Sequence, residues 1–517
     1  MGSLCGVDVG TSGTKAVIVD PAGRIQGRAL REYPLHWPRP GWAEQEAADW
    51  WRATCEAIRA ALADAGLSGR DIDAVGLSGQ MHGSVILDRH GEVIRPPILW
   101  CDVRTADACR KLTEAVGGRE RLIELTGNPA LEGFTAPKLV WIREHEPAHF
   151  ERIAHVLLPK DYVRYRMTGE IATEVSDAAG TLLFDVGARR WSAPVAAAVG
   201  LPLEALPPVL ESSEVAGRLT AEAAEATGLL PNTPVVAGGA DNTCGAVGAG
   251  IVQPGRLLSS IGSSGVVLAQ TERMVKDPQG RVHTFNHSVP HRWYLMGVTL
   301  AAGLSLRWWR DQFGAIEREV ERRTGIDAYE LLGRTAAQSP PGSRGVFFLP
   351  YLNGERTPHA DANARGVFFG LSTAHTRADV VRAIFEGVAF GLRDCVEIFR
   401  QMGQDVEELR AIGGGAKSPL WRQIQADLFQ TEVLTLAIDE GPAFGAALLA
   451  GVGIGRYGSV AEAAEATVRI GGRTEPHEAH RALYDERYAL YRSLYPALRD
   501  RFAAAAALDG ETAGGKE

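Results

Sequence analysis

Apolar residues in the first eighty positions follow two different periods. Residues 4–9, 16–19 and 24–33 are short, β-branched runs that predict three strands, the first two joined by a glycine-rich turn. Residues 46–62 instead place large apolar side chains three or four positions apart, which predicts a helix with one buried face. Residues 72–77 are a further strand-like run that ends in Ser-Gly. Strands that alternate with a long helix indicate an α/β fold.

The second half of the chain repeats this order of elements. Residues 257–261 and 266–269 are predicted strands on either side of another glycine-serine turn. Residues 380–399 carry apolar side chains at helical spacing behind a Thr-x-x-Asp capping pattern, and a strand at 409–412 ends in glycines. Chance produces one matching turn more easily than a matched order of elements. The pattern therefore predicts two α/β domains with the same core plan.

The domain boundaries follow from this repeat. Residues 1–252 and 253–490 are the two predicted domains, in a chain of 517 residues that is long enough for two or three. The tail, residues 503–517, is rich in alanine and then in glycine and glutamate, and we expect it to be disordered.

Composition and charge narrow the class of protein. Hydrophobic residues make up 45% of the chain and charged residues 23%, which is ordinary for a globular protein. The net charge of −9, without basic blocks, argues against binding to nucleic acid or to an anionic membrane. The six cysteines are scattered without a CxxC pair, which fits a reducing compartment. No secretion signal is recognisable at the start, so we expect a soluble cytoplasmic protein.

The two glycine-rich turns are the first candidate site. Backbone N–H groups in turns 10–14 and 262–265 can form an anion-binding nest, and small side chains let a phosphate approach closely. Hairpins also use glycine for their own geometry, but two such turns at equivalent positions indicate a nucleotide held between two domains. Asp8, just before the first turn, is suited to hold hydrated Mg²⁺. Lys15 either adds positive charge or is simply solvated.

Two further clusters contain polar groups at predicted strand ends. Asp241 follows an apolar run and stands among glycines, so it is either a turn or helix cap or a general base that accepts a hydroxyl proton. Gly79-Gln80-Met81-His82-Gly83 places an amide, a thioether and an imidazole together, which indicates either a polar-ligand pocket or a structural histidine.

Three short motifs resemble known sites but lack their context. Residues 145–149 match HExxH, but Pro147 disfavours the helix that zinc binding needs. Residues 453–458 match GxGxxG, but they follow a predicted helix rather than a strand and are expected to be a loop. Residues 510–516 nearly form a Walker A loop, but Glu517 stands where Ser or Thr must bind magnesium.

Longer stretches resemble the FGGY family of carbohydrate kinases, over about residues 4 to 455. Asp8–Lys15 resembles the first phosphate loop of the family. Gly133–His145 fits its first signature, and Gly366–Glu386 fits its second. Because two long matches occur independently and in the right order, the chain is identified as a member of this family.

The resemblance implies two ribonuclease-H-like domains of the actin-like ATPase type, closing a cleft over ATP, Mg²⁺ and a sugar. It makes Asp241 and Asp8 the catalytic carboxylates, with Asp8 holding the metal through water. Met81, His82, Asp241 and Asn242 would contact the sugar. The expected nucleotide contacts are Gly10, Thr11, Ser12, Gly13, Thr14 and Lys15 in the first loop, and Gly262, Ser263, Ser264, Gly303, Gly414, Gly415 and Ser418 in the second half.

The motifs GQMHG, GGADN, LPYLNGERTPH and GNPALEGFTAPK, taken together, resemble those members that phosphorylate D-xylulose at the expense of ATP. A kinase for ribulose, ribitol or fuculose is the alternative within the family. An actin-like ATPase that works by assembly is a more remote alternative, because it would not require the sugar-side motifs. A homodimer is common among the members of the family.

Overall fold

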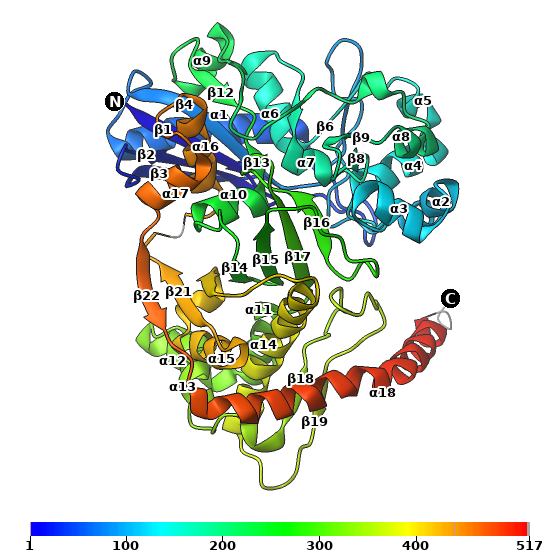
Figure 1. Cartoon of the computed structure of the whole chain (residues 1–517), viewed down its shortest axis with the longest axis vertical. Helices are drawn as coiled ribbons and strands as arrows, with labels where there is room; N and C mark the ends of the chain where they lie inside the picture. Colours follow the sequence, from blue (N-terminus) through cyan, green and yellow to red (C-terminus); the bar gives the residue numbers. More distant parts are fainter. Residues whose placement is uncertain (1, 439, 514–517) are drawn as a thin grey trace. The chain divides into compact units, whose positions relative to one another are not determined.

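Figure 1 shows the computed structural model, which describes residues 2–438 and 440–513. The chain divides into two compact units. Unit 1 consists of the residues up to Gln253 together with Gln270–Tyr294 and Ile438–Val468. Unit 2 consists of Pro254–Ala269, Leu295–Ala437 and the residues from Arg469 onward. The chain first leaves unit 1 one residue after the predicted boundary, and it then returns twice, which the sequence pattern does not indicate.

Unit 1 is built on a seven-stranded sheet with the order β11-β12-β4-β1-β2-β3, in which β13 also pairs with β4. The bounds are β1 Ser3–Val9, β2 Gly13–Val19, β3 Ile25–Glu32, β4 Ile72–Gly79, β11 Val215–Arg218, β12 Pro234–Val236 and β13 Gly239–Ala240. β1 runs antiparallel to β2 and parallel to β4, and β13 is also parallel to β4. The predicted strands, turn and order of this region are therefore present.

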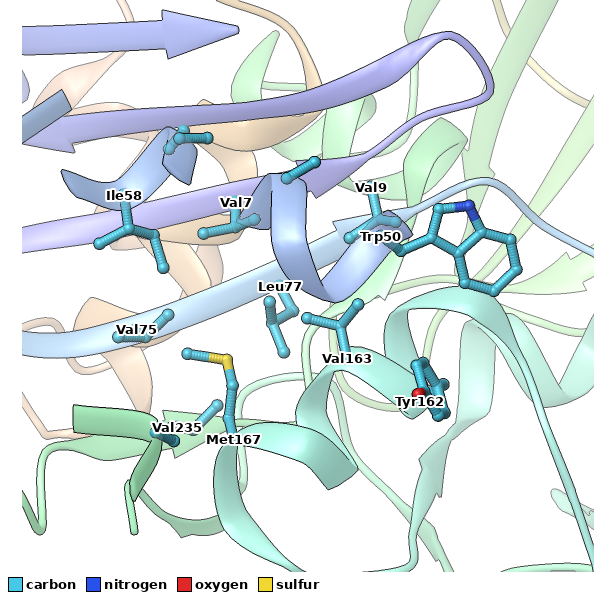
Figure 2. Close-up of a cluster of buried hydrophobic side chains, with 14 of the residues drawn as sticks. Val7, Val9, Trp50, Ile58, Val75, Leu77, Tyr162, Val163, Met167 and Val235 are labelled. Carbon is cyan, nitrogen blue, oxygen red and sulfur yellow. The ribbon is translucent and has the colours of Figure 1, made fainter. Parts of the chain in front are cut away.

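Apolar side chains cover both faces of this sheet because they alternate along its strands. On one face, Val7 and Val75 pack with Trp50 of α1 (Ala47–Ala65) and Met167 of α6 (Pro159–Thr168), and all are buried; Figure 2 shows this cluster. On the other face, Leu4 and its neighbours pack with α10 (Asp241–Gly248) and α16 (Pro442–Gly453). The result is a sheet between two helical layers.

Two glycines explain why the late segment 438–468 belongs to unit 1. A Cβ at Gly6 would lie 1.9 Å from the carbonyl oxygen of Ala443, and one at Gly76 would lie 1.9 Å from that of Ala446. The backbone of α16 therefore approaches β1 and β4 too closely for any side chain at these positions. α16 is almost wholly buried, so its apolar surface is covered by this contact.

Unit 2 contains strands of a second seven-stranded sheet, which has the order β16-β17-β15-β14-β20-β21-β22. The bounds are β14 Arg256–Ile261, β15 Gly265–Thr271, β16 His283–Asn286, β17 Trp293–Thr299, β20 Glu408–Ile412, β21 Glu432–Leu436 and β22 Ile470–Thr474. β14 and β15 form an antiparallel hairpin, and β14 is parallel to β20. This arrangement repeats that of β1, β2 and β4, as the sequence predicts.

The predicted helix near Thr376 is α14, Arg377–Gln401. Asp379 Oδ2 accepts hydrogen bonds from the backbone N–H and the hydroxyl of Thr376, at 2.7 and 2.9 Å, which caps the first turn. The last helix, α18 (Arg481–Ala513), continues through much of the tail. The structure therefore differs from the predicted disorder over 503–513, where the alanines favour a helix, while 514–517 lie outside the described residues.

The remaining elements of unit 1 are β5 Val85–Leu87, α2 Ala106–Ala115, α3 Arg119–Thr126, α4 Thr135–His145, α5 Pro147–Phe150, β6 His155–Leu157, β7 Thr173–Glu174, α7 Val175–Ala179, β8 Phe184–Asp185, β9 Arg190–Trp191, α8 Ala193–Val199, η1 Leu203–Ala205, β10 Val209–Leu210, α9 Ala221–Thr227 and α17 Val460–Thr467. Those of unit 2 are α11 Gly303–Phe313, α12 Ala315–Thr324, α13 Ala328–Ala336, η2 Ser343–Gly345, β18 Phe347–Leu349, β19 Val367–Phe369, η3 Gly414–Lys417, α15 Pro419–Phe429 and η4 Glu478–His480. Of the helices that the structure describes, none combines the length and the apolar composition needed to cross a membrane.

Candidate active site

The strand register of unit 1 brings the residues predicted to contact the sugar and the residue predicted to hold Mg²⁺ to one edge of the sheet. Ser78 of β4 pairs with Asp8 of β1 on one side and with Gly239 of β13 on the other. The residues that follow these three parallel strands therefore emerge at the same level. In α/β folds this carboxyl edge is the usual place for a ligand.

The two predicted catalytic carboxylates interact electrostatically at this edge. Burial and, to a smaller extent, the negative charge of Asp8 together raise the pKa of Asp241 to about 7, against the effect of the Asn242 backbone N–H. Burial also raises the pKa of Asp8 to about 6, while the charge of Lys15 opposes this rise. Asp241 is partly exposed at the start of α10. A carboxyl with a pKa near the pH of the cell is suited to act as a general base.

Asp8 also has the character of a magnesium ligand. Its Oδ1 atom is buried and has no hydrogen-bond partner among the residues that the structure describes. Mg²⁺ prefers oxygen ligands and keeps several waters, so a single carboxylate with an oxygen free to accept is chemically suited to a hydrated ion. The residues present are therefore compatible with the predicted Mg²⁺.

Asn242 connects Asp241 to Met81, and His82 follows Met81 in the chain; the contact of these residues with a sugar stays a prediction. The side-chain amide of Asn242 donates to Asp241 Oδ1 at 3.1 Å and to Met81 Sδ at 3.5 Å. Its backbone N–H also donates to Asp241 Oδ1, at 2.7 Å. A Cβ at Gly180 would lie 2.8 Å from Met81 Cε and 3.0 Å from His82 Nδ1. These contacts fix the orientation of the carboxylate and leave no room for a side chain at position 180.

His82 is held in an uncommon backbone conformation by a buried lysine. Its φ of 68° lies in the left-handed region, which costs free energy for a non-glycine residue. Lys138 Nζ donates to the carbonyl oxygens of His82 and Gly133 at 2.8 and 2.7 Å, and Thr135 Oγ1 donates to that of His82 at 3.1 Å. Burial lowers the pKa of Lys138 to about 7. Lys138 is thus a positioning residue for the histidine loop.

A second buried cation supports the backbone before Asp241. Lys160 Nζ lies 2.9 Å from Asp161 Oδ1, 3.2 Å from Glu174 Oε1 and 2.8 Å from Asp177 Oδ2, and all four side chains are fully buried. Burial raises the pKa of Asp177 to about 8, so this carboxyl retains a proton near neutral pH.

Ser176 connects this charged cluster to the site. Its hydroxyl lies 2.8 Å from both carboxylate oxygens of Glu174, and Ser176 Oγ accepts from the backbone N–H of Ala240 at 3.0 Å. The residue directly before the proposed base is thereby fixed by a buried network of charges.

The first glycine turn is anchored by buried amides. Gln45 Nε2 donates to the carbonyl oxygen of Thr11 at 2.7 Å, and Gln80 Nε2 donates to Gln45 Oε1 at 2.9 Å. Trp50 Nε1 donates to the same oxygen of Gln45 at 3.0 Å, and Trp100 Nε1 donates to Thr11 Oγ1 at 2.9 Å. Gly10 N–H donates to the carbonyl oxygen of Gly13 at 3.1 Å and closes the turn. The turn thus has a fixed shape.

Lys15 is ion-paired in the structure, with 32% of its side chain exposed. Its ammonium lies 2.5 Å from Glu440 Oε2, and Arg28 pairs with the other oxygen of that carboxylate. These two cations hold the pKa of Glu440 below its usual range, against the effect of burial. A contact of Lys15 with phosphate stays a prediction and would require this ion pair to rearrange.

The second glycine turn, in unit 2, is held mainly by backbone contacts. Gly262 N–H donates to the carbonyl oxygen of Ser264 at 3.0 Å, and Gly303 N–H donates to that of Gly262 at 2.9 Å. A Cβ at Gly303 would lie 2.3 Å from the oxygen of Gly262. Arg307 Nη2 donates to Ser263 Oγ at 2.9 Å. The close approach explains why position 303 requires glycine.

The glycines after β20 lie beside the same turn. β20 is parallel to β14, with Ile412 opposite Ser260, so both strands end at one level. A Cβ at Gly414 would lie 3.8 Å from the carbonyl oxygen of Ile261, and one at Gly415 would lie 2.5 Å from Ile261 Cβ. Ser418 instead caps α15, since its Oγ accepts from Trp421 N–H at 3.3 Å. The structure thus gathers the predicted glycines of unit 2, while the nucleotide contacts themselves stay predictions.

The short motifs do not form sites among the described residues. α4 ends at His145 and α5 starts at Pro147, so the two histidines of HExxH do not share a helix. His145 stacks on Trp141 with ring centroids 4.6 Å apart, and His149 Nδ1 lies 2.9 Å from Glu146 Oε2. Residues 454–458 follow α16 as a loop, as expected. The Walker-like stretch ends outside the described residues.

Four supporting residues were not predicted as part of the site. Gln45 and Lys160 stand in no recognisable motif, and the charged residues around Lys160 in α6 give no local sign that its side chain is buried. Lys138 lies in Gly133–His145, which fits the first family signature, but its role and that of Trp100 depend on contacts with residues distant in sequence.

Comparison with known proteins agrees with this geometry. The models of the FGGY carbohydrate kinase N-terminal and C-terminal domains match residues 3–248 and 257–454. The xylulose kinase of Bacillus subtilis is 43% identical over 96% of this chain and 97% of its own length. That of Escherichia coli is 42% identical over 86% of this chain and 89% of its own.

Solved structures give the same result. The crystal structure of xylulose kinase from Rhodospirillum rubrum superposes with a TM-score of 0.88, at 33% identity, over 97% of this chain and all of that one. The predicted α/β fold of the actin-like ATPase type is thereby confirmed. With family models and relatives matching most of its length, the chain belongs to the FGGY family of carbohydrate kinases.

Proposed function

We propose that this protein transfers the terminal phosphoryl group of ATP to a primary hydroxyl of D-xylulose, giving D-xylulose 5-phosphate and ADP. The observation that carries the proposal is the carboxylate of Asp241, whose pKa of about 7 and connection to Met81 through Asn242 suit a base for a sugar hydroxyl. The relatives named xylulose kinase support the choice of sugar.

The residues of unit 1 have distinct roles in this reaction. Asp241 accepts the proton of the attacking hydroxyl, so that the oxygen becomes nucleophilic as it approaches phosphorus. Asn242 holds the carboxylate in place through two hydrogen bonds, and Met81 and His82 shape the sugar side. Mg²⁺ near Asp8, when bound, would neutralise charge on the phosphate oxygens. The N–H groups of the two glycine turns bind phosphate oxygens.

Phosphoryl transfer asks the protein mainly for positioning and for stabilisation of charge. The buried Lys138 and Lys160 serve positioning: Lys138 holds the backbone carbonyl of His82, and Lys160 pairs with Glu174, which reaches the backbone before Asp241 through Ser176. Exclusion of water from the site also favours transfer to the sugar, because water would otherwise compete with the sugar as phosphoryl acceptor.

The acceptor is tested by measuring ADP release from the full chain with ATP, Mg²⁺ and a panel of D-xylulose, ribulose, ribitol and fuculose. We expect the highest kcat/KM with D-xylulose and little ADP without sugar, and NMR of the product should show phosphate at C5. A higher kcat/KM with another ketose or polyol would reassign the substrate. Sugar-independent turnover together with filaments would favour an assembling ATPase.

We also propose that the protein acts in the cytoplasm, where ATP is supplied, and that it forms a homodimer. Light scattering coupled to size-exclusion chromatography tests the dimer: a mass near twice 55.4 kDa supports it, and a mass near 55.4 kDa contradicts it.

A further inference from the structure

Unit 2 contains a cluster of possible metal ligands that has no part in the proposed reaction. Asp427 of α15 and the two histidines His477 and His480 have ligand atoms that all lie within 4.8 Å of one another. His480 Nδ1 is 2.7 Å from Asp427 Oδ2, and His477 Nδ1 is 3.4 Å from the same oxygen. His477 Nδ1 also lies 3.2 Å from Asp427 Oδ1, so the two imidazole nitrogens converge on one carboxylate group.

The local fold explains this convergence. His477 and His480 are three residues apart, at the N-cap and the last residue of the short helix η4, so their side chains lie on the same side of one turn. Their ring centroids are 5.0 Å apart. Asp427 stands near the C-terminal end of α15 and is buried, with 3% of its side chain exposed.

The carboxylate of Asp427 is oriented before any ion binds. Its Oδ1 atom accepts from Gln423 Nε2 at 2.8 Å and from the backbone N–H of His477 at 2.7 Å. Such outer contacts are typical of residues that hold metal ligands in position. Oδ1 also lies 3.2 Å from His477 Nδ1, so this ring faces both carboxylate oxygens, while His480 Nδ1 contacts Oδ2.

The alternative is that each histidine merely donates an Nδ1 hydrogen to Asp427. In a tetrahedral zinc site with bonds of about 2.0–2.1 Å, ligand atoms lie about 3.3 Å apart. The 3.4 Å between His477 Nδ1 and Asp427 Oδ2 already fits this ligand-to-ligand distance. The 2.7 Å between His480 Nδ1 and Asp427 Oδ2 must widen when the ion binds. The rings have room to move, because the side chains of His477 and His480 are 56% and 30% exposed.

We propose that Asp427, His477 and His480 bind a transition-metal ion of the Zn²⁺ class, with water in the fourth position. Two nitrogens and one carboxylate oxygen favour Zn²⁺ over Mg²⁺ or Ca²⁺, which prefer oxygen alone. Binding moves the Nδ1 hydrogen of each neutral imidazole to Nε2 and frees both Nδ1 lone pairs for the ion. The ion links α15 to the segment that leads into α18, so its role is to stabilise unit 2.

The test is a titration of ZnCl₂ into the untagged, chelator-treated full chain, followed by calorimetry and by thermal unfolding. We expect one Zn²⁺ per chain at this site and a rise in Tm on addition of Zn²⁺, with no such rise from Mg²⁺. In His477→Gln and His480→Gln, the affinity should fall by at least about tenfold and the rise in Tm should disappear.

Glutamine can still donate a hydrogen bond to Asp427, so these variants separate metal binding from simple contact. Circular dichroism without metal shows that they fold. His375→Gln, which changes a half-buried histidine of the same unit that bonds with Ser372, is the matched control and should bind Zn²⁺ like the wild type. The absence of saturable Zn²⁺ binding, or equal affinity in the wild type and both variants, would overturn the proposal.

Discussion

The two glycine turns have the same backbone plan and different surroundings. In both units an antiparallel hairpin is followed on one side by a parallel strand, and a glycine N–H closes the turn. Two residues before the first turn stands Asp8, whereas Ser260 stands at the equivalent place before the second. Unit 1 thus contributes a charged group at the position where unit 2 contributes only a hydroxyl.

The means of fixing the turns differ as well. The first is held by side chains, in particular Gln45, Gln80 and Trp100. The second is held largely by close packing of Gly303 against the Gly262 carbonyl and of Gly415 against the Ile261 side chain, where a methyl group would collide. The same hairpin is therefore supported in two ways, by side-chain hydrogen bonds in unit 1 and by close packing around glycines in unit 2.

The largest effect is expected from Asp241→Asn. This change keeps the shape of the side chain and removes its ability to take a proton, so turnover should fall by about 10²–10⁴-fold. Sugar and nucleotide binding, measured by calorimetry, should change little. Turnover within a few-fold of the wild type would mean that another group is the base.

Asp8→Asn and Ser260→Ala test the difference between the turns directly. Loss of the carboxylate should raise the Mg²⁺ concentration for half-maximal rate by more than about tenfold, because Mg²⁺ depends on charged oxygen ligands. The change at the equivalent position of unit 2 should leave this concentration unchanged. Equal shifts in the two variants would show that the turns do not differ in this way.

Many of the features that distinguish the two turns can be predicted from the sequence. The paired turns, the carboxylate at 8 and the strand-to-helix position of Asp241 follow from local patterns, and the structure places them as expected. The supporting residues do not follow, because their partners are remote: Lys15 pairs with Glu440, 425 positions away. Likewise, the position of α16 depends on Gly6 and Gly76, and nothing in the sequence around these glycines indicates that a distant helix packs against them.

Gly303→Ala probes the packing of the second turn. The added methyl group must displace the Gly262 carbonyl, at a cost of about 1–3 kcal/mol, so the KM for ATP should rise by about tenfold. Gly333→Ala, in α13, is the control, because its Cβ would meet nothing closer than 3.9 Å. A KM for ATP unchanged by Gly303→Ala would contradict the role of this turn.

Gln45→Met probes the side-chain anchor of the first turn and should have the smallest effect on rate. It leaves Trp50 Nε1 and Gln80 Nε2 without their acceptor and should lower the free energy of unfolding by about 1–3 kcal/mol. Denaturant unfolding measures this loss, and the KM for ATP should rise only a few-fold. An unchanged stability would show that the amide network does not support the turn.

The central claim, that Asp241 is the base, is tested most directly by the pH dependence of kcat/KM for the sugar. Because the base acts when deprotonated, the rate should rise with pH, and burial together with the charge of Asp8 moves this rise from near pH 4 toward pH 7. The wild type should show a single ascending limb, and Asp241→Asn should show a low rate without it. The same limb in both proteins would contradict the account.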